Sequence, residues 1–205
     1  MKEFNCVIAG TGGQGVLTLM RIISEAALRQ GYDVKTSELH GLSQRGGPVP
    51  CHIRFGEKIY SPIVMEGEAH LIIALEPLEA LRSSYYGSKE NKTTILVNNY
   101  SIIPLSVFVA KEIYPSLDEI LETLGNFSTR VITLNASSIV KEAVGNITPS
   151  NIYMLGYAVS KGLIPLDEKF VLEGIEENVP KKFLEINKKV FELGISRDKA
   201  LIEPV

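Results

Sequence analysis

The amino-acid sequence predicts an α/β protein with three layers, α/β/α, around a mostly parallel sheet, followed by a helical portion. Three observations favour this class. Short apolar runs alternate with longer segments of helical periodicity, which is typical of βαβ units. The first apolar run ends in a glycine-rich stretch that leads directly into a helical pattern. From about residue 149 the strand patterns stop and only helical patterns remain.

The opening of the chain predicts a β-α-β unit. Residues 4–10 form a short apolar run that ends in glycine, as expected of a buried strand. Residues 15–31 carry apolar side chains on most faces and end at a glycine, which predicts a buried helix. Residues 33–39 predict the next strand. Two strands joined through a helix are expected to be parallel, with a right-handed crossover.

The middle of the chain predicts a hairpin and then three further strands separated by helices. Alternating residues on both sides of residues 55–58 indicate a β-hairpin excursion within residues 49–64. The remaining strand patterns cover residues 70–76, 93–99 and 129–135. The helical patterns between and after them cover residues 77–86, 116–125 and 136–145.

The last part of the chain predicts three helices, at residues 149–162, 167–179 and 180–194. In the third, four apolar residues recur at helical spacing: Phe183, Ile186, Val190 and Leu193. We expect this stripe to pack on the sheet domain. Because no repeat or linker interrupts the pattern, residues 1–205 are expected to form a single domain.

Composition argues against several classes of protein. The chain has 205 residues, 45% of them hydrophobic, and a formal net charge of −3, which suits one sizeable core. The sequence has neither the clustered basic stretch of a nucleic-acid-binding protein nor an apolar run of the roughly 18 residues that a membrane span needs. The N-terminus enters a strand pattern at once, so we expect no signal peptide and a cytoplasmic protein.

The cysteines and two of the histidines carry no sign of chemistry. Cys6 and Cys51 do not belong to a Cys-x-x-Cys pair, so the chain alone is not expected to build a zinc site or an iron–sulfur cluster. Cys6 lies in an apolar strand and is expected to be a small buried hydrophobe, without a disulfide. His52 and His70 lie within strand patterns.

The glycine-rich stretch between the first strand and the first helix predicts an anion-binding loop. It satisfies the Gly-x-Gly-x-x-Gly pattern with Gly10, Thr11, Gly12, Gly13, Gln14 and Gly15. Small residues let backbone N–H groups approach a phosphate, and the helix N-terminus adds partial positive charge. Glu38 closes the second strand near the position of an acid that binds the ribose of NAD. NAD binding is therefore one hypothesis, and a tight strand–helix turn without a ligand is the other.

Two details weaken the NAD hypothesis. The chain after Glu38 enters a glycine-flanked loop and a hairpin instead of a second regular βα unit. The sequence also shows no substrate domain with an acid–base pair.

A second polar loop follows the predicted strand at residues 33–39. It contains His40, Gln44, Arg45, Gly46 and Gly47. Because parallel strands end at the same edge of a sheet, this loop and the glycine loop are expected to meet there. Together they would form a hydrogen-bonding rim that suits an anion or a partner. For Arg45 alone the alternative is a solvated turn residue, and for His40 it is a structural residue instead of a base.

Four segments occur in an order that resembles one known family: GTGGQGV, ELHGLSQRGGPV, IYSPIVMEGEAHLIIALEPLEAL and NIYMLGYAVSKGLIP. In them the chain is similar to the gamma-type subunits of the 2-oxoacid:ferredoxin oxidoreductases, especially the small subunit of the indolepyruvate branch. The paired Gly-x-Gly-Gly-Gln-Gly and Gln-Arg-Gly-Gly motifs are far more specific than either alone. The resemblance covers nearly the whole chain and implies a Rossmann-like fold. Pro48 departs from it, since a small polar residue such as Ser is expected there.

The resemblance also implies an activity. Such enzymes oxidatively decarboxylate a 2-oxoacid with thiamine diphosphate and Mg²⁺, pass two electrons through iron–sulfur clusters to ferredoxin, and form an acyl-CoA. In the indolepyruvate branch the substrates are arylpyruvates. Thiamine diphosphate and the clusters are implied to lie on a larger subunit, through which ferredoxin is reached.

The sequence agrees with a subunit that carries no cofactor. It has no Gly-Asp-Gly segment upstream of Asn98 and Asn99, as a thiamine motif requires, and no cysteine cluster. We therefore expect a chain with no catalytic residue of its own, inactive alone, whose two loops complete or cover a site held by the larger subunit. The alternatives are a free-standing Rossmann-type dehydrogenase that uses NAD and a non-enzymatic interaction module.

Overall fold

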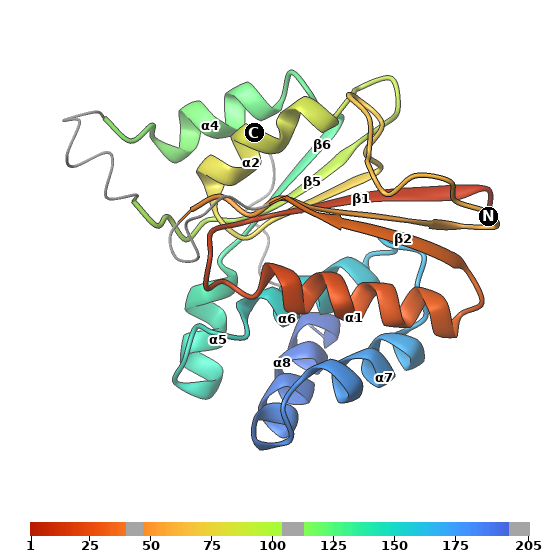
Figure 1. Ribbon diagram of the computed structural model, residues 1–205. Helices are drawn as coiled ribbons and strands as arrows, with labels where there is room; N and C mark the ends of the chain where they lie inside the picture. The colour runs from red at the N-terminus through yellow and green to blue at the C-terminus, as the bar shows by residue number, and fades with distance from the viewer. Residues whose placement is uncertain (40–46, 104–112, 197–205) are drawn as a thin grey trace.

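The computed structural model describes residues 1–39, 47–103 and 113–196, which form a six-stranded sheet flanked by helices (Figure 1). The strands are β1 (Glu3–Ala9), β2 (Asp33–Glu38), β3 (Cys51–Gly56), β4 (Leu71–Ala74), β5 (Thr94–Asn98) and β6 (Arg130–Leu134). Their order in the sheet is β2-β3-β1-β4-β5-β6. Neighbours from β1 to β6 are parallel, whereas β3 is antiparallel to both β1 and β2.

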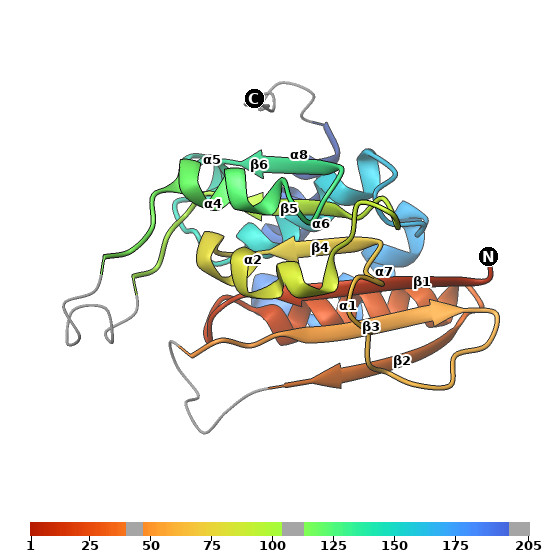
Figure 2. The same cartoon turned by 90° about the horizontal axis from the view of Figure 1, so that it is seen from above.

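Helices cover both faces of the sheet, so the predicted three-layer α/β architecture is confirmed (Figures 1 and 2). One face carries α1 (Val16–Arg29), α5 (Ala136–Val144), α6 (Ser150–Ser160), α7 (Glu168–Asn178) and α8 (Leu184–Ser196). The other face carries α2 (Pro77–Ser83) and α4 (Leu117–Leu124). Two short 3-10 turns, Ser84–Tyr86 and Lys181–Phe183, follow α2 and precede α8.

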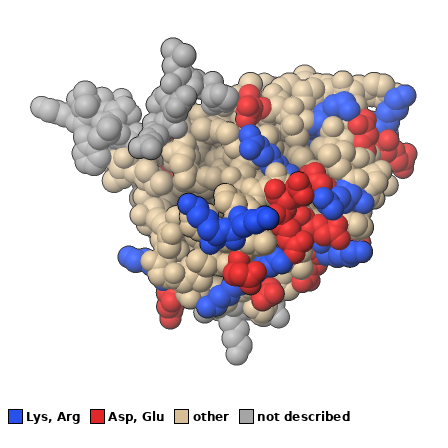
Figure 3. All heavy atoms as spheres, turned by 60° about the horizontal axis from the view of Figure 1, so that its bottom comes forward, with Lys and Arg blue, Asp and Glu red and all other residues tan. Residues whose placement is uncertain are grey.

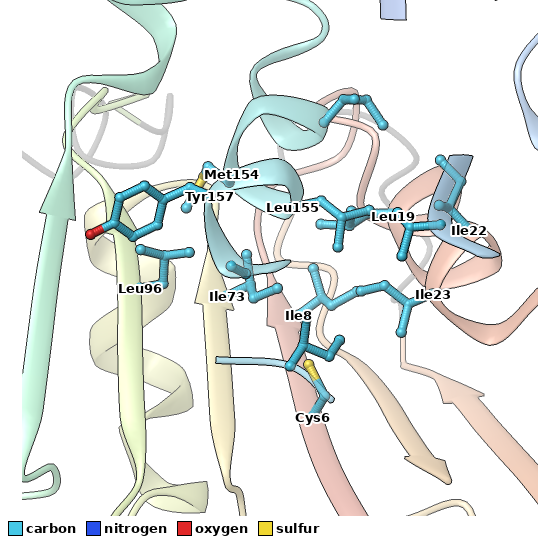
Figure 4. Packing of buried hydrophobic residues seen from close by; sticks show 14 of the residues in the cluster. Cys6, Ile8, Leu19, Ile22, Ile23, Ile73, Leu96, Met154, Leu155 and Tyr157 are labelled. Carbon is cyan, nitrogen blue, oxygen red and sulfur yellow. The ribbon is translucent and has the colours of Figure 1, made fainter. Parts of the chain in front are cut away.

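The strands contribute side chains to two hydrophobic cores, because successive side chains of a strand point to opposite faces of the sheet. On the face of α1 and α6, side chains of β1, β4 and β5 meet those of the helices, as Figure 4 shows for Cys6, Ile8, Ile73, Leu96, Leu19, Ile23 and Leu155. On the other face, alternate residues of the same strands pack against α2 and α4: Val7, Ala9, Ile72, Ile95, Ala80, Ile120 and Leu124.

Both cysteines are buried free thiols, as expected of small hydrophobes. Burial raises the pKa of the Cys6 thiol to about 12 and that of Cys51 to about 12. A thiolate is the nucleophile and metal ligand, so neither side chain is prepared for that chemistry.

The predicted hairpin around residues 55–58 is wrong. Residues 57–70 contain no strand, and β3 pairs instead with β1 and β2. Gly56, the glycine that suggested a turn, instead lets the backbone of Lys2 approach β3 closely. A Cβ on Gly56 would lie 2.4 Å from the carbonyl oxygen of Lys2. The antiparallel partner that precedes β3 is β2, so the loop with Arg45 in its sequence connects these two strands.

The predicted stripe on the last helix is also wrong in part. Val190 is buried, together with Phe191 and Gly194, but Phe183 and Ile186 are exposed. The helix α8 packs mainly on α6. The buried side is therefore set by the neighbouring helix, which the sequence stripe alone did not reveal.

Glycines allow the helices on the larger face to cross at short range. A Cβ on Gly156 of α6 would lie 2.4 Å from the carbonyl oxygen of Phe191, and one on Gly194 of α8 would lie 2.3 Å from that of Tyr153. Gly174 of α7 approaches the Ile22 carbonyl of α1 in the same way, at 2.7 Å. Since no larger residue fits without a shift, these glycines determine how the helical layer packs.

The outer surface of this layer carries charges of both signs (Figure 3). Arg29 of α1 forms an ion pair with Glu25 at 2.6 Å and another with Glu173 of α7 at 3.2 Å. Surface pairs of this kind contribute little to stability, at about 0–1 kcal/mol each. They show that α1 and α7 lie side by side, and they do not mark a site.

Candidate functional site at the carboxyl edge of the sheet

The glycine loop and the end of the second polar loop meet at the carboxyl edge of the parallel strands. The N–H of Gly12 donates to the Gly47 carbonyl at 2.9 Å, and the N–H of Val49 donates to the Gly10 carbonyl at 2.8 Å. Thr11 and Pro48 form an isolated β-bridge beside them. The expectation that the two loops come together is confirmed for these residues. His40, Gln44, Arg45 and Gly46 lie outside the described residues.

The strand order explains this contact. Because β3 lies between β1 and β2, the chain that leaves β2 returns alongside the end of β1. The same insertion moves Glu38 away: it pairs with Cys51, two strands from the glycine loop. At about 4.8 Å per strand, this displacement is roughly 10 Å. In a Rossmann NAD site the acid follows a strand adjacent to β1, so the geometry does not support that hypothesis.

Two of the loop glycines are required by the backbone. Gly13 has φ of +104° and Gly15 has φ of +77°, a region that residues with a side chain rarely adopt. Gly15 is the N-cap of α1 and has no side chain to cap it. A Cβ on Gly13 would meet no atom of residues 1–39, 47–103 or 113–196 within 4 Å, and Gly13 is exposed, so these residues leave its backbone open to an approaching group.

The side chain of Gln14 closes the loop on the sheet. Its Oε1 accepts a hydrogen bond from the N–H of Thr11 at 2.7 Å, and its Nε2 donates to the Leu75 carbonyl at 3.0 Å. Leu75 directly follows β4, so Gln14 bridges the ends of β1 and β4. The helices after these two strands lie on opposite faces (Figure 1), so their ends form the switch point at which open α/β sheets bind ligands. Here a protein side chain crosses it.

Gly10 leaves room for the side chain of Gln14 to close the loop on the sheet. A Cβ there would lie 2.8 Å from Cγ2 of Val16 and 2.9 Å from Oε1 of Gln14. Thr11 is buried, and its hydroxyl donates to Gln14 Oε1 at 3.2 Å. The loop therefore has two parts: Gly10, Thr11 and Gln14 pack inward, whereas Gly13 faces outward.

Asn151 belongs to this site and was not singled out from the sequence. Its Nδ2 donates to the Gly15 carbonyl at 3.0 Å, and its Oδ1 accepts from the N–H of Ile152 at 2.9 Å. A Cβ on Gly15 would lie 2.6 Å from that Nδ2. The first turn of α6 is thereby held against the first turn of α1. Asn151 is the first residue of the segment NIYMLGYAVSKGLIP, which was the available signal.

Further amides extend the polar edge toward β6. Asn98 is buried, and its Nδ2 donates to Ser137 Oγ at 2.9 Å and to the Leu75 carbonyl at 3.3 Å. The amide of Asn99 donates to Asn135. Asn98 and Asn99, which lack the upstream segment of a thiamine motif, thus tie together the ends of β4, β5 and β6.

The electrostatics near the glycine loop suit an anion. The first turns of α1, α5 and α6 contain no acidic residue and no side-chain cap. By contrast, the first turns of α2, α4, α7 and α8 each contain at least one acidic residue. Since a helix N-terminus carries partial positive charge, the absence of carboxylates leaves that charge uncompensated at α1 and α6.

Within residues 1–39, 47–103 and 113–196, no group of three or more His, Cys, Asp and Glu side chains is placed to hold a metal ion. In the same ranges no helix is long and apolar enough to cross a membrane.

Residues 5–197 match the family described as pyruvate ferredoxin/flavodoxin oxidoreductase. The chain belongs to this family. The resemblance inferred from the glycine and arginine motifs is confirmed. Among curated members, the indolepyruvate oxidoreductase subunit IorB of Thermococcus kodakarensis is 38% identical over 98% of this chain and 99% of its own length. IorB of Archaeoglobus fulgidus is 39% identical over 95% of both chains.

Solved structures of the family share the fold. The gamma subunit of a keto/oxoacid ferredoxin oxidoreductase from Geobacter sulfurreducens has a TM-score of 0.66 at 20% identity, over 94% of this chain and 96% of its own. A 2-oxoglutarate:ferredoxin oxidoreductase from Magnetococcus marinus has a TM-score of 0.69 at 18% identity, over 95% of this chain and 30% of its own. At these identities the likeness establishes the architecture alone.

Proposed function

We infer that the chain is a subunit of a 2-oxoacid ferredoxin oxidoreductase whose substrates are indolepyruvate and related arylpyruvates. The observation that carries this conclusion is the 36–39% identity to four IorB subunits over nearly the full length. The common gamma subunits of pyruvate/ketoisovalerate oxidoreductases are more distant, at 26–29%. The complete enzyme decarboxylates the 2-oxoacid, forms an acyl-CoA and reduces ferredoxin.

The partner is a larger subunit of the same enzyme. We propose that it holds thiamine diphosphate with Mg²⁺ and the iron–sulfur clusters and passes electrons to ferredoxin. The family resemblance implies this assignment, and the sequence agrees with it, since this chain has neither a Gly-Asp-Gly thiamine segment nor a Cys-x-x-Cys pair. The chain contributes no catalytic residue and is inactive by itself.

The carboxyl edge is the part of this chain that faces the partner's active site or the path of CoA. Its loops contain Gly10, Thr11, Gly12, Gly13, Gln14 and Gly15, and His40, Gln44, Arg45, Gly46 and Gly47. Three features support this orientation: the contact between Gly12 and Gly47, the open backbone of Gly13, and first turns without carboxylates at α1 and α6. Such a surface suits a carboxylate, a diphosphate or a CoA phosphate.

The test is reconstitution. The chain is expressed with and without the larger subunit encoded in the same genome, and reduction of a viologen dye is followed with indolepyruvate and CoA. We expect the chain alone to be inactive, the larger subunit alone to have little activity, and the complex to turn over. Turnover by the purified chain alone, with contaminating partner excluded by mass spectrometry, would contradict the proposal. Enhanced nicotinamide fluorescence on titration with NADH would instead favour a free-standing dehydrogenase.

A further inference from the structure

Exposed apolar side chains occur at both edges of the sheet. At the carboxyl edge, the chain between β5 and α4 exposes Tyr100, Ile103 and Ile113, the last of them 93% accessible. The loop between β3 and β4, which starts and ends at the amino edge, exposes Tyr60, 83% accessible, and Met65. Exposed apolar surface of this kind is typical of contact with another protein, so the question is which edge makes the contact.

The buried carboxylate of Glu76 ties the two described ends of the connection between β5 and α4 to the sheet. Glu76, which follows β4 and is 1% exposed, caps α2 by accepting from the N–H of Glu79 through Oε2 at 3.0 Å. Through Oε1 it accepts from the N–H of Ile102 at 3.3 Å and from the hydroxyl of Tyr114. The two donors to Oε1 lie next to Ile103 and Ile113, the exposed residues on either flank.

The second function of Glu76 goes beyond capping a helix. A cap needs one acceptor oxygen, and burying a carboxylate costs free energy that its hydrogen bonds must offset. A neutral cap such as Ser or Asn would accept the bond from α2 without that cost. Burial and the bond to Glu76 raise the pKa of Tyr114 to about 12, so its hydroxyl stays protonated and donating throughout the physiological range.

We propose that residues 99–103 and 113–116 form a docking surface for the larger subunit, held in place by Glu76 as a positioning residue. This inference rests on the proposed function and names the face of the chain that the partner covers. Tyr100, Ile103 and Ile113 supply the apolar contacts. The end of β4 links this surface to the glycine loop, because the Leu75 carbonyl, one residue before Glu76, accepts from Gln14 and from Asn98.

A matched pair of variants tests which edge docks. Ile113→Asp and Tyr60→Asp place the same charge on two highly exposed apolar positions at opposite edges. Both isolated variants should keep the melting temperature of the wild type. The affinity for the purified larger subunit, measured by interferometry, should fall at least about tenfold for Ile113→Asp and stay within about threefold for Tyr60→Asp. Equal affinities for Ile113→Asp and wild type, or a loss confined to Tyr60→Asp, would overturn the inference.

The role of Glu76 is tested by coupling. Tyr114→Phe removes one donor to Glu76 and keeps the ring, so it should weaken binding of the larger subunit several-fold. If Tyr114 acts by positioning Ile113, the double variant Tyr114→Phe/Ile113→Asp should bind no more weakly than Ile113→Asp. Additive losses, or a Tyr114→Phe variant with unchanged affinity, would rule out the positioning role.

The outcomes separate this inference from the proposed function. If the wild-type chain binds no larger subunit and reconstitutes no activity, the proposed function fails and the inference fails with it. If the wild-type complex forms and turns over but Ile113→Asp binds equally well, the function stands and the docking surface is wrong.

Discussion

Glycine serves opposite purposes in two regions of this molecule. At the crossing of α6 and α8 it is needed because there is no space: a Cβ on Gly194 would lie 2.3 Å from a backbone carbonyl. In the loop after β1, no atom of the described residues crowds Gly13, yet its φ of +104° still favours glycine. The crossing therefore uses glycine for stability, and the loop uses it to keep an exposed backbone in an unusual conformation.

A valine in place of glycine should destabilise the protein most at the crossing of α6 and α8. Gly194→Val forces two helix backbones apart, and overpacking of this kind costs about 1–3 kcal/mol, here at or above the upper end. In a chain of this size each kcal/mol lowers the melting temperature by about 2–4 °C. Thermal unfolding followed by circular dichroism should show a fall of roughly 6–12 °C. The control is Glu192→Ala on the exposed side of α8, and a Gly194→Val variant as stable as that control would contradict the packing.

Arg45 is the residue of the loop region whose loss should affect activity most. Its position lies outside the described residues, so its role remains a prediction from the sequence. If it donates a charge-assisted hydrogen bond to an anion, Arg45→Ala costs about 1.5–3 kcal/mol, or about 10- to 150-fold in kcat/KM of the reconstituted complex. The melting temperature should hardly change, and Arg45→Lys should restore part of the activity. Unaltered kcat/KM for both arylpyruvate and CoA would indicate that Arg45 is a solvated turn residue without a ligand.

Gly13→Val is the counterpart of Gly194→Val. Its Cβ would meet no atom in the part of the chain that the structure describes, so we expect a loss of stability from backbone strain of roughly 1–2 kcal/mol. The larger part of the effect should appear in the complex, because the added side chain occupies the open space above the loop. We expect a well-folded chain with reduced kcat/KM after reconstitution. A folded variant with full activity would show that this loop is merely a turn.

The smallest effect concerns the sheet core that lies apart from both regions. His52 of β3 is fully buried, its Nδ1 accepts from the N–H of Val64 at 3.1 Å, and burial lowers its pKa below 6.5. Below pH 6.5 the unfolded chain takes up a proton that the folded chain resists, so the free energy of unfolding should fall as pH decreases. Above that pH this contribution is constant. Urea unfolding at pH 5.5, 6.5 and 7.5 gives the free energy of unfolding as a function of pH. This dependence on pH should be weaker for His52→Gln than for the wild type, and an identical dependence would argue against the role of His52.

Much of the candidate site was predictable because it depends on local signals. The sequence predicted the glycine loop, its place between strand and helix, and its meeting with the second polar loop, now seen in the contact between Gly12 and Gly47. The inward role of Gln14 and the participation of Asn151 were not predicted. Both depend on carbonyl groups, at Leu75 and Gly15, that are far away in the sequence or carry no side-chain signal.

The sequence by itself determined the kinds of element, the edge at which the two loops lie, and, through its paired motifs, the family. Only the tertiary structure decided that β3 enters between β1 and β2, that α8 buries Phe191 whereas Phe183 in the turn before it is exposed, and that Gly56 and Gly194 serve close packing. The physical reason is that periodicity reports which way a side chain points along its own helix or strand. The use of a glycine, or the partner of a strand, depends on which backbone from elsewhere in the chain lies within a few ångströms.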